Sequence, residues 1–178
     1  GFDRFFGAQW EKEFKDEAAR KALLEKEAPA MRENCLKVSH IFFNVLQALN
    51  NGASKAKIRE QLRLEAQKAW ARLEKGESFE KLAAELSQDY ANKEHGGALG
   101  VVPKMIFGRS FGEESEKLPY GKYSKPVESP WGFHIIVKSP IEDSDLLKLL
   151  KEEYLATKSE EARQKALDEA KIEFKKAK

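Results

Sequence analysis

The chain has 178 residues, a length that allows one domain or one small domain with appendages. Hydrophobic residues make up 41% of it, enough to build a core, so a wholly disordered chain is excluded. The 32 Lys and Arg residues nearly balance the 30 Asp and Glu residues, which argues against a dedicated nucleic-acid-binding protein.

The first predicted segment, residues 8–34, has a helical pattern. Its apolar residues recur every four positions at Trp10, Phe14, Ala18 and Ala22. Pro29 has no N–H and clashes with the preceding turn, so we expect it to kink or break this helix. The sequence shows no charged-then-apolar leader and no apolar run near the ~20 residues of a membrane span, so neither is expected in this chain.

The middle zone, residues 36–139, alternates strands and helices. Residues 38–45 are rich in β-branched and aromatic types and predict a strand. An apolar face from Ile58 to Leu73 predicts a helix that ends before Gly76, and Ser78 is the expected N-cap of a second helix. A short strand is expected at residues 99–102, a short helix or turn at 111–118, and two last strands at 124–127 and 133–138.

The third zone, residues 143–178, is helical again, with an apolar stripe at Leu146, Leu147, Leu150 and Tyr154. This stripe and the one near Trp10 both need burial. The simplest solution is that they pack on each other. We therefore predict one helical lobe built from both ends of the chain.

Two of the three histidines, His40 and His134, lie inside predicted strands between apolar neighbours. A buried imidazole needs a hydrogen-bond partner, and the simplest one is the other histidine. A structural pair and a functional pair both remain open at this point.

Other kinds of site find less support. A zinc site built from His40, His134 and a carboxylate is conceivable but has no ligand spacing behind it, and the single Cys35 excludes a cysteine-built one. The sequence contains no GxSxG motif, so a serine hydrolase of that type finds no support. The glycines of residues 96–100 precede a strand rather than a helix, which indicates a tight turn and not a phosphate loop.

Five short motifs occur in one order: VSHI at residues 38–41, FEKLA at 79–83, GGALG at 96–100, KPV at 125–127 and WGFHII at 131–136. This order resembles the parvulin-type peptidyl-prolyl cis/trans isomerases, and the resemblance covers residues 36–139. It implies an α+β fold in which helices wrap a four-stranded antiparallel sheet. It also implies that no metal or other cofactor is needed.

The resemblance also assigns roles to single residues. The histidine pair lies beneath the family's active site, and Asp89 falls where the family has Cys or Asp. We expect Asp89 to act electrostatically, the alternative being a cap of the loop after the preceding helix. The implied catalytic residues are His40, Asp89, Ser129 and His134, and the implied proline-binding residues are Leu99, Phe107, Phe111 and Trp131.

Five positions depart from the family pattern. Phe107 replaces the usual Met, and Ala98 replaces the usual Asp of the glycine turn. Glu116 stands where a core Phe is common, Gly112 where Glu is common, and Asn44 replaces a frequent Lys. A shallower proline pocket would follow. The alternative to an isomerase is therefore a non-catalytic holdase that keeps the domain as a peptide-binding module.

The flanking helices make the chain similar to the extracytoplasmic foldases of the SurA- and PrsA-like class. This implies a chaperone-like lobe at residues 1–35 and 140–178 around an isomerase domain at residues 36–139. It also implies unfolded or partly folded, proline-containing clients and a periplasmic or surface-associated location. The alternative use of the terminal helices is to pair two copies in a homodimer, and no nucleic-acid partner is expected.

Overall fold

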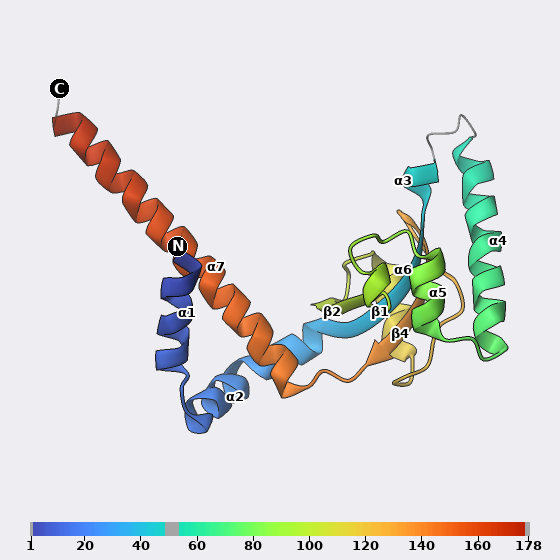
Figure 1. Cartoon of the computed structure of the whole chain (residues 1–178), viewed down its shortest axis with the longest axis horizontal. Helices are drawn as coiled ribbons and strands as arrows, with labels where there is room; N and C mark the ends of the chain where they lie inside the picture. Colours follow the sequence, from blue (N-terminus) through green and yellow to red (C-terminus); the bar gives the residue numbers. More distant parts are fainter. Residues whose placement is uncertain (1, 49–53, 177–178) are drawn as a thin grey trace. The chain divides into compact units, whose positions relative to one another are not determined.

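The computed structural model describes residues 2–48 and 54–176 (Figure 1). The chain divides into two compact units, one of Gly1–Met31 with Glu142–Lys178 and the other of Arg32–Ile141. They are described separately below.

The second unit is built on a four-stranded sheet in the order β2-β1-β4-β3, with every neighbouring pair antiparallel. The strands are β1 (Cys35–Asn44), β2 (Ala98–Pro103), β3 (Val127–Ser129) and β4 (Gly132–Ser139). The predicted α+β class and antiparallel sheet are confirmed. The strand expected at residues 124–127 instead begins at Val127, and before it Tyr123 makes only an isolated bridge to Val137.

One face of this sheet carries the larger core. Ile41 and Phe43 of β1 and Phe133 and Ile135 of β4 pack there with the buried residues of α4 (Lys55–Glu74) and α5 (Phe79–Leu86). Each helix is capped at its start, since the hydroxyls of Ser54 and Ser78 accept backbone N–H groups of the first turn. The cap at Ser78 was predicted from the sequence, and the cap at Ser54 was not. The short α3 (Val45–Ala48) follows β1, and a 3-10 turn η2 (Lys93–His95) precedes β2.

The other face carries α6 (Arg109–Lys117) and a smaller core. Because side chains alternate along a strand, Leu36, Val38, His40 and Phe42 of β1 share this face. His134 and Ile136 of β4 lie beside them through the pairs Phe42↔His134 and His40↔Ile136. The sheet therefore places both strand histidines on the face that α6 covers.

A β-bulge in β2 places the Leu99 side chain on the sheet face that α6 covers. Val38 pairs with Gly100 but Ser39 pairs with Ala98, so Leu99 is an extra residue without an opposite partner. Gly100 has φ +72°, a conformation that glycine adopts at little cost. The extra residue shifts the alternation, so that Leu99 and Val102 pack on one cluster although three positions separate them.

The first unit is helical, with α1 (Phe2–Glu13), most of α2 (Glu17–Asn34) and α7 (Asp143–Lys176). The rings of Trp10 and Phe14 contact that of Tyr154, with centroids 5.4 and 6.3 Å away. Lys151 Nζ lies 2.5 Å from Glu11 Oε1. The predicted packing of the two ends of the chain into a helical lobe is thus confirmed.

Pro29 was predicted to kink or break the N-terminal helix, and the structure contradicts the break. Helix α2 continues through Pro29 to Asn34. The helical segment is interrupted instead between Glu13, where α1 ends, and Glu17, where α2 begins. The Asp16 carboxylate accepts the N–H of Ala19 at 2.7 Å and so starts a new helix. Pro29 is exposed, where water can bind the carbonyl that its missing N–H leaves unpaired.

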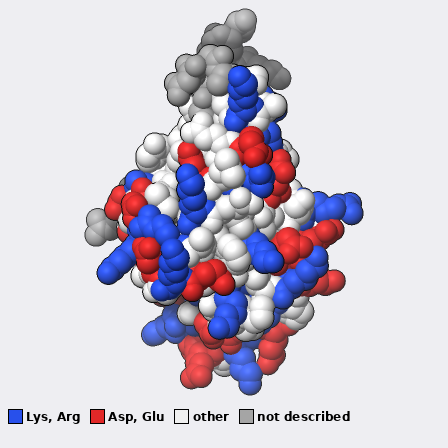
Figure 2. Space-filling model, turned by 90° about the vertical axis from the view of Figure 1, so that its right-hand side faces the viewer, with Lys and Arg blue, Asp and Glu red and all other residues white. Residues whose placement is uncertain are grey.

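The charged residues are mixed on the surface. On the face drawn in Figure 2, Lys and Arg lie among Asp and Glu, and neither sign covers a large area. No helix among residues 2–48 and 54–176 is both long enough and apolar enough to cross a membrane.

The first prediction concerns Gly97, which lies against the backbone of His40. Its φ is +71°, and a Cβ there would lie 2.1 Å from the His40 carbonyl oxygen. Gly97→Ala should lower the free energy of unfolding by about 3 kcal/mol, measured by urea denaturation, because left-handed strain and a backbone collision add together. Gly121→Ala is the matched control, since φ is +72° with open space around the position, and it should cost only about 1 kcal/mol. Equal losses in the two variants would contradict the proposed collision.

Candidate active site

The centre of the candidate site is a buried pair of imidazoles. His40 on β1 and His134 on β4 are diagonal neighbours across the strand pair, and both side chains are fully buried. Their Nδ1 atoms are 3.1 Å apart, within hydrogen-bond distance. The structure thus makes each histidine the partner of the other.

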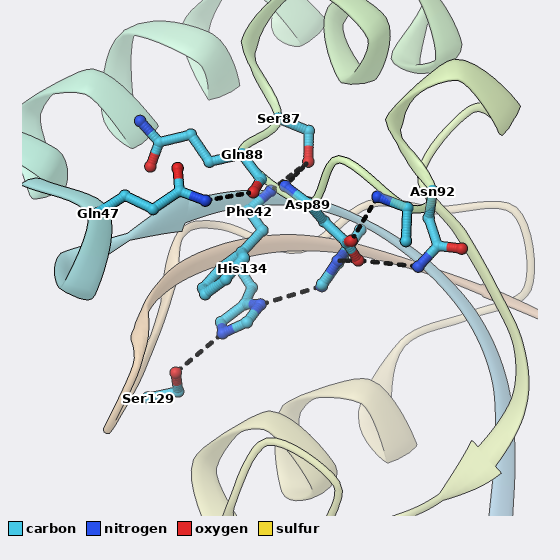
Figure 3. A network of polar contacts seen from close by, with 10 residues as sticks. Phe42, Gln47, Ser87, Gln88, Asp89, Asn92, Ser129 and His134 are labelled. Atoms are coloured by element: carbon cyan, nitrogen blue, oxygen red, sulfur yellow. Dashed lines mark hydrogen bonds and ion pairs between the residues drawn. The ribbon is translucent and has the colours of Figure 1, made fainter.

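The pair belongs to a longer chain of polar contacts, drawn in Figure 3. At one end, His40 Nε2 lies 3.0 Å from Asp89 Oδ2. At the other end, Ser129 Oγ lies 2.8 Å from His134 Nε2. All four residues predicted as catalytic are therefore connected in one line.

The ionised carboxylate fixes the direction of these hydrogen bonds. Burial raises the pKa of Asp89, but hydrogen bonds from Asn92 and His40 outweigh it, so the pKa is lowered overall. Asp89 therefore accepts from His40 Nε2–H, which leaves His40 Nδ1 as the acceptor for His134 Nδ1–H. His134 Nε2 then accepts the Ser129 hydroxyl, so every proton of the chain points toward Asp89.

Both imidazoles are neutral in this arrangement. Burial lowers the pKa of His40 more than Asp89 raises it. Burial lowers the pKa of His134 well below its ordinary value, and the neighbouring His40 lowers it further. A second proton on His40 would also place two N–H groups face to face at the 3.1 Å contact.

The loop that carries Asp89 is attached to β1. Ser87 ends α5, and its buried hydroxyl accepts the N–H groups of Phe42 at 3.1 Å and Asp89 at 3.3 Å. The N–H of Gln88 donates to the Phe42 carbonyl at 2.7 Å. Asp89 Oδ1 also accepts the N–H of Ala91 at 3.2 Å, so the carboxylate caps its own loop while it holds His40.

An aromatic group covers the imidazoles. The Phe107 ring lies 5.2 Å from His40, 4.9 Å from His134 and 5.0 Å from Phe111, measured between centroids. Phe111 is fully buried beneath it, and Leu99 is half-buried in the same cluster. Trp131 meets Phe107 edge-on at 6.1 Å and is 41% exposed. Of the residues predicted to bind proline, Phe107 and Trp131 thus reach the surface and Phe111 forms the floor.

Two residues of the site were not predicted from the sequence. Phe42 stacks on His134 with the rings 4.5 Å apart and 13° from parallel. Asn92 donates from Nδ2 to Asp89 Oδ2 at 2.9 Å. Phe42 could have been found from the strand alternation, two positions after His40. Asn92 follows Asp89 by three positions, but an asparagine in a polar loop gives no signal by itself.

The arrangement supplies a fixed negative charge and a polarised chain of dipoles beside an apolar, aromatic surface. Within residues 2–48 and 54–176, no group of three or more His, Cys, Asp and Glu side chains could hold a metal ion. Such a site suits a reaction that needs apolar binding and a local electric field.

A protein-family model matches the part of the chain that holds the site. The family model described as "Rotamase: PPIC-type PPIASE domain" matches residues 40–139, which are 100 of the 178 residues. The match includes every residue that the sequence analysis placed in the site.

Individual proteins are similar over shorter parts of their length. A foldase protein PrsA of Clostridium tetani is 44% identical over 72 residues, which are 40% of this chain and 21% of that protein. A chaperone SurA of Pseudomonas fluorescens is 35% identical over 83 residues, 47% of this chain and 20% of that protein. These matches span about a fifth of each relative.

A solved structure is similar over nearly the whole chain. The crystal structure of PrsA from Bacillus subtilis matches with a TM-score of 0.52 and 27% identity, over 94% of this chain and 60% of that one. The similarity therefore extends beyond the unit that contains the sheet, Arg32–Ile141, to the flanking helices.

The second prediction is that acid lowers the stability of the fold through the histidine pair. The unfolded chain takes up protons near the ordinary pKa of 6.5, while burial keeps both folded imidazoles neutral below it. Acid thus favours the unfolded state, and the stabilisation present above pH 6.5 is lost as the pH falls toward the lowered folded values. The free energy of unfolding, measured in urea between pH 7.5 and 5, should fall by up to about 1.4 kcal/mol per pH unit for each histidine.

The control is His134→Gln, which removes one of the two titrating rings and should make the dependence shallower. A free energy of unfolding that stays constant from pH 7.5 to 5 in the unmodified protein would contradict the neutral, buried pair.

Proposed function

The chain belongs to the PPIC-type peptidyl-prolyl isomerase (rotamase) family, and on this premise we propose that it catalyses cis/trans rotation of Xaa-Pro bonds in protein clients. The single observation that carries the proposal is the line from Ser129 through both histidines to Asp89 beneath Phe107. It joins a polarised hydrogen-bond chain to an aromatic surface suited to a prolyl ring.

The reaction requires no covalent chemistry at the site. Rotation about the peptide bond faces a barrier of about 20 kcal/mol, because resonance gives the C–N bond double-bond character. The rotation breaks no covalent bond of the peptide, so no nucleophile is required. The enzyme needs only to bind the twisted amide better than the planar forms.

Two features of the site would favour the twisted amide. The apolar wall of Leu99, Phe107 and Phe111 would hold the ring and exclude water, which disfavours the charge-separated resonance form of the planar amide. The Asp89 carboxylate would add to this effect, because a negative charge disfavours the partial negative charge on the planar amide's carbonyl oxygen. Its bonds to His40 and Asn92 hold that charge in place.

The helical unit would add chaperone function. The boundaries expected for this lobe, residues 1–35 and 140–178, remain a prediction. Support comes from the similarity to the Bacillus subtilis PrsA structure over 94% of the chain. A foldase of this kind would act on unfolded or partly folded, proline-containing proteins outside the cytoplasm, and the pairing of two copies through the terminal helices remains a further prediction.

The third prediction tests the activity directly. The protein should speed cis/trans exchange of an Xaa-Pro peptide, measured by NMR exchange spectroscopy. Asp89→Asn should slow the catalysed exchange about tenfold, because the fixed charge and the direction of the hydrogen-bond chain are lost. Glu94→Gln, at an exposed carboxylate of the neighbouring η2, is the charge-matched control and should leave the rate unchanged.

An exchange rate that the unmodified protein does not raise would refute the isomerase proposal. A suppressed aggregation of an unfolded client under the same conditions would then favour the non-catalytic holdase.

The fourth prediction tests the proline-binding surface. Phe107→Ala should raise KM and lower kcat/KM about tenfold, since it removes the half-buried ring that touches both imidazoles. Phe111→Ala is a poorer test, because truncating a fully buried Phe costs roughly 3–5 kcal/mol of stability. Ile106→Ala, at an exposed neighbour of Phe107, is the control. An equal KM in Phe107→Ala and Ile106→Ala would place the proline ring elsewhere.

A further inference from the structure

We propose that Arg59 is a positioning residue of the isomerase site, although it lies on α4 at the opposite face of the sheet. From there it holds the turn between β3 and β4, and this turn supplies Ser129 and Trp131 to the site. The activity part of this inference rests on the proposed function, whereas its spectroscopic part does not.

The Arg59 guanidinium contacts three successive residues of this turn. Nη2 donates to the Ser129 carbonyl at 2.8 Å and Nη1 to the Pro130 carbonyl at 3.4 Å. Nε and Nη2 also donate to Glu128 Oε1, at 3.0 and 2.5 Å. The planar, five-donor guanidinium makes all four of these bonds at once, one more than the three N–H groups of an ammonium could make.

The position of the guanidinium is restricted by its surroundings. It lies over the Phe133 ring, 5.9 Å from the centroid, and the side chain is only 24% exposed. The Glu128 carboxylate balances its charge. Partial burial makes these bonds less subject to competition from water than those of a surface pair.

The same turn provides the last link of the polar chain. Ser129 Oγ donates to His134 Nε2 at 2.8 Å and accepts the Trp131 N–H at 3.2 Å. The Trp131 carbonyl in turn accepts the N–H of Val45 at 2.8 Å. Holding the Ser129 and Pro130 carbonyls therefore holds the hydroxyl against His134 and the Trp131 ring against Phe107.

Ser129 has only one proton to donate, and a second acceptor is near. The Gly132 carbonyl lies 3.3 Å from Ser129 Oγ, against 2.8 Å for His134 Nε2. A loosened turn would let the hydroxyl turn to Gly132. His134 would then lose the partner that keeps its proton on Nδ1, and the direction of the chain would no longer be fixed.

Arg63 offers a matched control on the same helix. It is one turn further along α4, and its guanidinium bonds to Glu60 at 2.9 and 2.6 Å. Arg63→Gln makes the same charge change as Arg59→Gln without removing a hydrogen bond to the turn or the site.

The experiment compares Arg59→Gln, Arg59→Lys and Arg63→Gln in the full chain. Nitrogen-15 NMR of the imidazoles reports the tautomer of His134, thermal melting reports the fold, and Xaa-Pro exchange reports kcat/KM. Arg59→Gln should move the His134 Nδ1 and Nε2 resonances toward a mixture of tautomers and lower kcat/KM about tenfold. Arg59→Lys should restore part of both, and Arg63→Gln should change neither.

Unchanged His134 resonances in a folded Arg59→Gln protein would overturn the proposal, as would equal changes in Arg63→Gln. Where Arg59→Gln does not fold, Arg59→Met keeps an apolar stem over Phe133 without donors and is judged by the same criteria. If the unmodified protein does not speed Xaa-Pro exchange but Arg59→Gln still shifts the His134 resonances, the positioning role is supported and the isomerase proposal is refuted.

Discussion

The structure of the site depends on the need of two buried imidazoles for hydrogen bonds. His40 and His134 are fully enclosed on one face of the sheet, where a polar group without a partner costs roughly 1–3 kcal/mol. The 3.1 Å bond between them satisfies one nitrogen of each ring. The two remaining nitrogens require partners outside the sheet, and these partners determine where the surrounding loops must lie.

Each outer partner is held by contacts of its own. The loop of Asp89 is attached to β1 by the Ser87 hydroxyl and by the backbone bond from Gln88. The turn of Ser129 is attached to α4 by Arg59. The two ends of the polar chain are thus fixed by separate elements, so the electrostatic field at the aromatic surface is preorganised before any peptide binds.

Much of the fold and several residues of the site could be predicted from the sequence, because they depend on short stretches of the chain. The β-branched and aromatic residues around the two histidines placed them on strands, Ser78 marked a helix start, and the order of motifs pointed to the sheet and its class. Pro29 was misjudged because the cost of a proline depends on whether its side of the helix faces solvent. The break came from Asp16, whose carboxylate caps the next helix. Arg59 and Asn92 could not be found, because their partners are set by the folded contacts rather than by any periodic pattern in the chain.

The two ends of the sheet unit also bear on how such chains can be assembled. The pair Lys37↔Ser139 lies near the start of β1 and at the end of β4, so the strands by which the polypeptide enters and leaves the sheet lie side by side, about 5 Å apart. A module with adjacent termini can be spliced into a loop of another protein, or removed from it, while the host ends stay where they were. The unit of Arg32–Ile141 therefore has the geometry of a module that evolution or an engineer could exchange as a whole.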